Sequence, residues 1–165
     1  DVYDLATFPT YDGFSIFPTL LYPKSRGFVG LRSSDPLADP VIQPNFLSHK
    51  DDIDQLVRGT KIALEVMNQS DMKPMIKEII APLDSSSDYA IIKHIKKSVE
   101  TVYHPVGTCK MGSDDMAVVD NQLRVHGIQN LRVVDASIMP KIVAGNTNAP
   151  AYMIAEKASD MILGK

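Results

Sequence analysis

The sequence lacks paired cysteines, an excess of basic residues and any long apolar run. Its one cysteine, Cys109, cannot form an internal disulfide, and the four histidines show no metal-ligand spacing with it. We therefore expect no bound metal. The net charge of -3 comes from interspersed acidic and basic residues, so the basic stripe that nucleic-acid binding requires is absent.

Sequence features of membrane insertion and secretion are also missing. No apolar run reaches the roughly 18 residues of a membrane helix, and the first residues lack the basic-then-apolar layout of a signal peptide. The chain starts at Asp1 without a Met, which favours a processing site or an artificial boundary. The compartment stays open, with a soluble cytoplasmic protein or a peripheral membrane protein favoured.

The sequence has enough apolar residues for one ordinary core. With 165 residues and a hydrophobic fraction of 44%, it predicts a single globular unit. The first third is rich in β-formers: Phe14–Tyr22 and Gly27–Arg32 read as two strands, joined by a turn at Pro23–Arg26. Asp35–Asn45 contains three prolines, so we expect an ordered loop with a short strand at Val41–Ile42.

Helices are predicted at three places. Ser48 is a candidate cap for the first, which should end near Asn68. The second should run from Ser87 to about Val99, with Lys93, Lys96 and Lys97 in water and its inward residues at Tyr89, Ile91, Ile92 and Ile95. The last has Pro150 in its first turn and Gly164 at its end, with an apolar stripe formed by Ile154, Ala155, Ala158, Met161 and Ile162.

Two short β-type runs, Leu123–Gly127 and Leu131–Asp135, lie before the last helix and could pair. This order of strands and helices predicts an α+β fold with a mainly antiparallel sheet flanked by helices.

The stretch from Tyr103 to Gly112 suits neither a helix nor a strand, because Pro105, Gly107 and Gly112 shape it as a loop. His104 lies in this loop just before the proline, which holds it away from helical geometry. From the residues alone, His104 is either a structural histidine or a catalytic base. His49, His94 and His126 lack this context, and we expect them to be structural or solvent-facing.

A second unusual stretch combines a β-type run that ends in Asp135 with a loop of small polar residues, Gly145–Pro150, that opens the last helix. Unpaired N–H groups at such a helix start can bind a polar or anionic group. The alternative is that Asn148 merely caps the helix.

Taken together, these stretches resemble the C-terminal signature of the glucose-methanol-choline (GMC) oxidoreductases. The resemblance is carried by His-Pro-Val-Gly-Thr-Cys-Lys-Met-Gly, Leu-Arg-Val-His-Gly, Leu-Arg-Val-Val-Asp-Ala-Ser-Ile-Met-Pro and Gly-Asn-Thr-Asn-Ala-Pro, and it is nearly continuous from Tyr103 to Ile162. The upstream Pro-Lys-Ser-Arg-Gly resembles the family's substrate-binding segment. The variant with Asn146 is most similar to the choline dehydrogenase and alcohol dehydrogenase branch.

The resemblance implies an FAD-dependent oxidation of an alcohol, with choline or a related alcohol as the leading substrate class. His104 would take the hydroxyl proton, and Asn146 would hold the alcohol oxygen by a hydrogen bond. We therefore expect the two side chains to converge on one cleft. The residues implied near the cofactor are Asp135, Ala136, Thr147 and Asn148.

One family feature is missing: Gly-x-Gly-x-x-Gly, which holds the FAD pyrophosphate, occurs nowhere in the chain. We interpret the chain as a C-terminal fragment that is inactive alone and needs the N-terminal FAD-binding portion of the same protein. Residues 1–115 would form the substrate-binding domain with the His104 loop, and residues 116–165 would complete the FAD domain. An exposed apolar seam would favour a homodimer.

Several alternatives stay open. The electron acceptor is undecided between a dehydrogenase's carrier, such as a quinone, and oxygen, with a dehydrogenase preferred. A GMC-fold oxidase or lyase is a further alternative within the family. Outside the family, the chain could be a non-catalytic α+β binding module.

Overall fold

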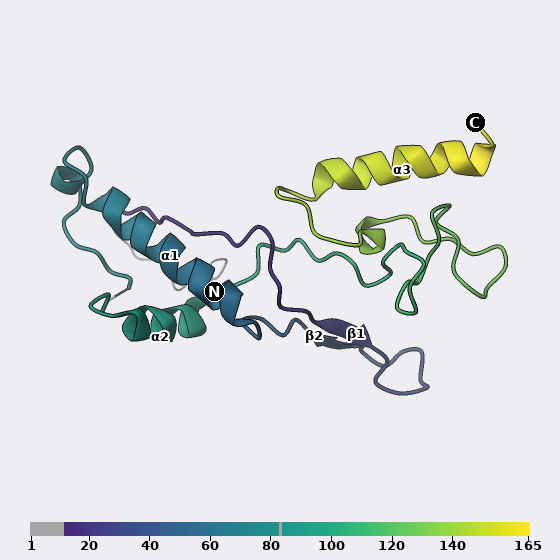
Figure 1. Ribbon diagram of the computed structural model, residues 1–165, viewed down its shortest axis with the longest axis horizontal. Helices are drawn as coiled ribbons and strands as arrows, with labels where there is room; N and C mark the ends of the chain where they lie inside the picture. The colour runs from purple at the N-terminus through teal and green to yellow at the C-terminus, as the bar shows by residue number, and fades with distance from the viewer. Residues whose placement is uncertain (1–11, 83) are drawn as a thin grey trace. The chain divides into compact units, whose positions relative to one another are not determined.

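The structure, a computed structural model, describes residues 12–82 and 84–165 (Figure 1). The chain divides into two compact units: the first comprises the described residues up to Arg26 together with Asn45–Thr101, and the second comprises Gly27–Pro44 and Val102–Lys165. Within the described ranges, no helix has both the length and the apolar character needed to cross a bilayer.

Two helices, α1 (Lys50–Met67) and α2 (Asp88–Ser98), form the body of the first unit. They lie against each other and bury a cluster of Val57, Ile91 and Ile95 (Figure 1). The predicted end of α1 is confirmed, since Asn68 is its C-cap. The prediction for α2 is confirmed at both ends, because Ser87 caps its start through a hydrogen bond from the Ala90 N–H and Val99 is its C-cap.

Two details of these helices differ from the prediction. His49, and not Ser48, caps α1: His49 has the extended backbone of a cap residue, and its Nδ1 accepts a hydrogen bond from the Asp51 N–H at 3.2 Å. Tyr89 is 78% exposed instead of inward-facing. Tyr89 lies in the first turn of α2, whereas the packing against α1 is centred on Ile91 and Ile95. A short 3₁₀ turn, η2 (Lys73–Met75), follows α1.

The one sheet of the described residues is a short antiparallel pair in the second unit. Strand β1 (Phe28–Gly30) pairs with β2 (Val41–Gln43), with Val29 opposite Ile42. The short strand expected near Val41 is therefore confirmed. Of the two strands expected before it, Gly27–Arg32 contains β1, whereas Phe14–Tyr22 is assigned no strand among the described residues. The Lys24 and Ser25 N–H groups of the expected turn donate to the Asp52 carboxylate.

The rest of the second unit is held by isolated bridges and turns around a core of Val119, Leu123, Ile138, Met139, Ile154 and Ala158. Val119 is fully buried and bridges both Met111 and Val125. The expected pairing of the two β-type runs is confirmed as one antiparallel bridge between Arg124 and Arg132.

Helix α3 (Asn148–Leu163) closes the chain, and the 3₁₀ turn η3 (Ala136–Ile138) packs near it. Ile154 and Ala158 face the core as predicted, whereas Ile162 is 59% exposed. Gly164 ends α3 with a left-handed φ of 68°, as expected. With three helices and one antiparallel sheet in the described residues, the α+β class is confirmed.

Candidate active site

The loop that contains His104, residues 103–112, is held by backbone hydrogen bonds to the segment that begins at Asp135. The Cys109 N–H donates to the Ser137 carbonyl at 3.0 Å, and the Met111 N–H donates to the Ile138 carbonyl at 2.8 Å. Gly107 has a φ of +84°, and a Cβ at this position would lie 3.1 Å from the Met139 carbonyl oxygen. A glycine is therefore needed where the two segments approach each other.

The four histidine side chains differ in their hydrogen bonds. His49 caps α1, His94 Nε2 lies 3.3 Å from the Ser98 hydroxyl, and His126 Nε2 lies 3.1 Å from the Gly112 carbonyl oxygen. His104 is half-buried, and among the described residues its ring has no hydrogen-bond partner. Its neighbour Tyr103 has a φ of 60°, an uncommon value for an aromatic residue, as found at sites that aim a side chain. His104 thus has a ring nitrogen available to a ligand.

Asn146 lies in the loop before α3, in the same compact unit as His104. Its side chain is exposed, and within the described ranges its amide makes no hydrogen bond. An amide offers both a donor and an acceptor to an incoming oxygen. The convergence of His104 and Asn146 on one cleft stays a prediction.

Asp135 caps η3: its Oδ1 accepts a hydrogen bond from the Ser137 N–H at 2.7 Å. The residue is exposed, so its carboxylate can accept further donors. The Ala136 N–H donates to no acceptor in the described part of the chain. Together these groups present one acceptor and one donor beside the His104 loop.

Helix α3 begins without a side-chain cap. Thr147 is the N-cap and makes no capping hydrogen bond, and Asn148 is the first helical residue. The alternative in which Asn148 caps α3 is therefore wrong: Asn148 lies one residue too far along the helix. An uncapped helix start leaves N–H groups and a positive dipole end available to a polar ligand.

Asp52 is an important polar residue that the sequence analysis missed. This carboxylate is 1% exposed and accepts hydrogen bonds from the Lys24 N–H, the Ser25 N–H and the Ser25 hydroxyl at 2.6–2.8 Å. Burial raises the pKa of Asp52, but these hydrogen bonds together hold it below its ordinary value. The only signal in the sequence was an acidic residue in a first helical turn, which is common at helix starts.

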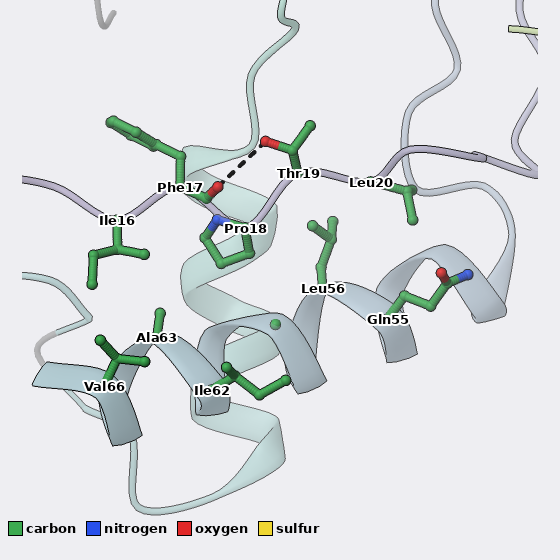
Figure 2. A pocket seen from close by; sticks show the side chains of 11 residues that line it. Ile16, Phe17, Pro18, Thr19, Leu20, Gln55, Leu56, Ile62, Ala63 and Val66 are labelled. Atoms are coloured by element: carbon green, nitrogen blue, oxygen red, sulfur yellow. Dashed lines mark hydrogen bonds between the residues drawn. The ribbon is translucent and has the colours of Figure 1, made fainter. Parts of the chain in front are cut away.

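The first unit also contains an apolar groove of about 330 Å³ between the Ile16–Leu20 stretch and α1 (Figure 2). None of the predicted site residues lines it. Its walls are largely apolar, with Thr19 and Gln55 as the polar side chains. The groove therefore does not belong to the predicted catalytic residues.

Comparisons with known proteins agree on one family. The sequence profile of the family described as GMC oxidoreductase matches residues 23–155. An alcohol dehydrogenase (acceptor) of Pseudomonas putida is 48% identical over 154 residues, which cover 93% of this chain and 28% of that protein. An oxygen-dependent choline dehydrogenase of Klebsiella pneumoniae is 45% identical with the same coverage.

Solved structures give the same result. The crystal structure of pyridoxine 4-oxidase from Mesorbium loti superposes with a TM-score of 0.82 at 32% identity, covering 88% of this chain and 28% of that one. The chain thus spans about 28% of the length of the relatives it matches.

Proposed function

Because the chain belongs to the GMC oxidoreductase family and corresponds to its C-terminal part, we propose that it supplies the catalytic side chains of an FAD-dependent oxidation of an alcohol to a carbonyl. One observation carries the proposal: His104, the histidine of the family signature, is the one histidine of four whose ring has no hydrogen bond among the described residues. A ring without a structural partner is free to act on a substrate hydroxyl.

In the proposed mechanism, His104 accepts the hydroxyl proton of the alcohol at a ring nitrogen. A neutral imidazole is a suitable base near neutral pH. The Asn146 amide donates a hydrogen bond to the same oxygen as negative charge develops on it, but it cannot take the proton. FAD, when bound, supplies the acceptor for the hydride that leaves the substrate carbon.

The chemistry of the residues present fits this cofactor. The exposed Asp135 carboxylate is a suitable acceptor for ribityl hydroxyls, and the Ala136 N–H is a suitable donor to a phosphate oxygen. The uncapped start of α3 provides N–H groups together with the Thr147 hydroxyl and the Asn148 amide for the polar edge of the flavin ring. We therefore assign Asp135, Ala136, Thr147 and Asn148 to FAD binding in the complete protein.

We further propose a small alcohol as substrate, with choline or a related alcohol as the leading class, since relatives of both kinds are more than 40% identical to the chain. We favour a dehydrogenase that passes its electrons to a carrier over an enzyme that passes them to oxygen. Residues 1–115 would belong to the substrate-binding domain and residues 116–165 to the FAD domain. An N-terminal FAD-binding portion would be the partner of this segment, and without it the exposed apolar seam would favour a homodimer.

The test is the rate of flavin reduction in a complete GMC oxidoreductase that contains this segment. His104→Ala should lower this rate by about two to four orders of magnitude, as for a lost general base. Asn146→Ala should lower it less, by about ten- to a thousandfold, as for one lost oxyanion donor. Anaerobic stopped-flow reduction by choline and other small alcohols measures both rates.

His94→Ala is the matched control, since His94 hydrogen-bonds within α2, and it should keep the parent rate. Flavin content is measured for every variant, so that lost cofactor is not mistaken for lost catalysis. If flavin were reduced in His104→Ala as fast as in His94→Ala, His104 would not be the base. A non-catalytic role for the His104 loop would then be the favoured hypothesis.

A further inference from the structure

A polar cavity of about 470 Å³ lies in the second unit. It is lined by Asp120 and by every residue from Arg124 to Arg132, which form the bridged pair of short runs and the turn that joins them. The cavity contains none of the residues assigned to catalysis or FAD binding. Its volume falls within the range of about 300–1,000 Å³ that is typical of small-molecule sites.

Two arginines lie directly opposite each other beside this cavity. Arg124 and Arg132 form an antiparallel bridge, and the hydrogen bonds of the Val125 N–H and the Val133 N–H, at 3.0 and 3.1 Å, lie on either side of it. The two arginines are therefore a non-hydrogen-bonded pair, whose side chains share one face and lie closer together than those of a hydrogen-bonded pair. Like charges directly opposite are destabilising, so this pair needs negative charge nearby.

Asp120 supplies negative charge to only one of the two arginines. Its Oδ2 lies 2.8 Å from Arg124 Nη2 and accepts a hydrogen bond from Arg124 Nε at 2.9 Å. Its Oδ1 accepts from the backbone N–H groups of Gln122 and Arg124. Both oxygens are thus committed away from Arg132. With His126 neutral, two arginines and one aspartate leave one surplus positive charge at the cavity, in a chain of net charge -3.

Arg132 is held in place while its charged end stays available. Its Nε donates to the Gln122 carbonyl at 3.2 Å, and in the described part of the chain no other group engages its two terminal nitrogens. The side-chain amides of Gln129 and Asn130 likewise make no hydrogen bond among the described residues. A guanidinium that is already positioned loses less conformational freedom when it binds an oxyanion.

We propose that this cavity binds the phosphate group of a small phosphate ester. The terminal N–H groups of Arg132 can donate in parallel to two phosphate oxygens. A tetrahedral phosphate has a further oxygen outside that plane, which suits the Gln129 or Asn130 amide, whereas a carboxylate has no third oxygen. The remaining volume accommodates the organic part of the ester. This inference does not depend on the proposed oxidation of an alcohol.

Calorimetric titration tests the binding without measuring activity. A complete GMC oxidoreductase that contains this segment, fully loaded with FAD, is titrated with glycerol phosphate and with inorganic phosphate. Bound FAD keeps the probes out of the cofactor's own phosphate contacts, and constant ionic strength holds the screening of surface charges fixed. Glycerol phosphate should bind saturably, with a lower Kd than inorganic phosphate.

Two results of this titration would contradict the proposal. Absence of saturable binding up to about 10 mM of either probe, weaker than a free energy of about -3 kcal/mol, would overturn the site. Equal affinity for the two probes would overturn the assignment to an ester and would identify the free anion as the ligand.

Variants locate the binding in this cavity. Arg132→Gln should raise the Kd for glycerol phosphate at least about tenfold, because the bidentate contact to a charged group is lost. Arg58→Gln is the control, since Arg58 is exposed on α1 and the change in charge is the same. It should keep the parent Kd, and an equal loss in Arg58→Gln would overturn the site.

Gln129→Glu gives a second test, in case Arg132→Gln alters the fold. This substitution places a negative charge in the cavity wall and removes no hydrogen bond of the described residues. It should also raise the Kd for glycerol phosphate, because like charges repel. Thermal unfolding checks that each variant is folded, and a parent Kd in a folded Gln129→Glu or Arg132→Gln variant would overturn the proposal.

Discussion

The first compact unit buries its apolar side chains between two regular helices, whereas the second gathers its core around turns and isolated bridges. In the first unit, Asp52 uses its hydrogen bonds to hold a loop on α1. In the second, His104 and Asn146 keep their polar atoms without hydrogen bonds among the described residues. Asp52 therefore stabilises the fold of the first unit, whereas His104 and Asn146 stabilise nothing through hydrogen bonds among the described residues, as the proposed role in ligand binding requires.

The two cores provide the largest test of this comparison. Ile91→Ala in the first unit and Ile138→Ala in the second should each lower the free energy of unfolding by about 2–5 kcal/mol, because each truncates a buried side chain. Urea unfolding combined with hydrogen exchange of each unit measures the effect. Each variant should loosen mainly its own unit.

Ile62→Ala is the control, because Ile62 is 60% exposed and its loss should change stability little. If Ile91→Ala and Ile138→Ala loosened both units equally, the two units would unfold as one block and the comparison would fail.

The Asp52 cluster tests whether a polar group stabilises the first unit. Asp52→Asn should cost about 1.5–3 kcal/mol, because an amide cannot accept all three hydrogen bonds from Lys24 and Ser25 that reach this carboxylate. Denaturant unfolding of the variant measures the loss. Asp51→Asn should leave stability nearly unchanged, since Asp51 is partly exposed and pairs with an exposed Lys24.

Lowering the pH should weaken the same contacts of Asp52 with Lys24 and Ser25. The pKa of Asp52 is lower in the folded chain than its ordinary value of 3.8, so folding holds the carboxylate in its charged form. Its contribution to stability is therefore complete above about pH 4 and is lost as the pH falls through the folded pKa. The acid unfolding of the parent chain should be steeper than that of Asp52→Asn, and identical slopes would show that Asp52 does not control it.

A substitution at Gly107 tests whether the close approach of the His104 loop to Met139 stabilises the second unit. Gly107→Ala should destabilise the second unit by about 1–2 kcal/mol, because an alanine is strained at a left-handed φ, and its Cβ would press on the Met139 carbonyl. Thermal unfolding measures the change.

Two other glycines separate the strain of a left-handed φ from the steric contact of an added Cβ. Gly127 also has a positive φ, but a Cβ there meets nothing within 4 Å, so Gly127→Ala should cost less than Gly107→Ala. Gly145 has neither constraint, and Gly145→Ala should be neutral or slightly stabilising. A cost at Gly145 as large as that at Gly107 would contradict the assigned role of Gly107.

The smallest expected effect is at the start of α2. Ser87→Ala removes the hydrogen bond from the Ala90 N–H and should cost about 1 kcal/mol of stability in the first unit. Circular dichroism during urea unfolding measures it. Ser85→Ala is the control, because Ser85 is exposed and makes no hydrogen bond among the described residues, and equal losses would show that Ser87 acts otherwise than as a cap.

Helix positions were predictable to within about two residues, because apolar spacing and cap residues act within a few positions of one another. The residue that caps α1 was not predictable from the sequence, because Ser48 and His49 are neighbours. Only the backbone conformation of His49 brings its ring to the Asp51 N–H. The β-forming composition of Phe14–Tyr22 predicted a strand, but the described residues of this run form none. The candidate site residues followed from the family signature, and their roles stay predictions.

By itself, the sequence determined the helices, the stop at Gly164, the loop around His104 and membership of the family, because each depends on residues close together along the chain or on a motif. Only the tertiary structure decided that β1 pairs with β2, that Asp52 holds Lys24 and Ser25 from 27 or 28 positions away, and that His104 alone of the histidines has no hydrogen bond in the described residues. These outcomes depend on which distant groups meet once the chain has closed, and local patterns do not encode which of several polar groups will be satisfied.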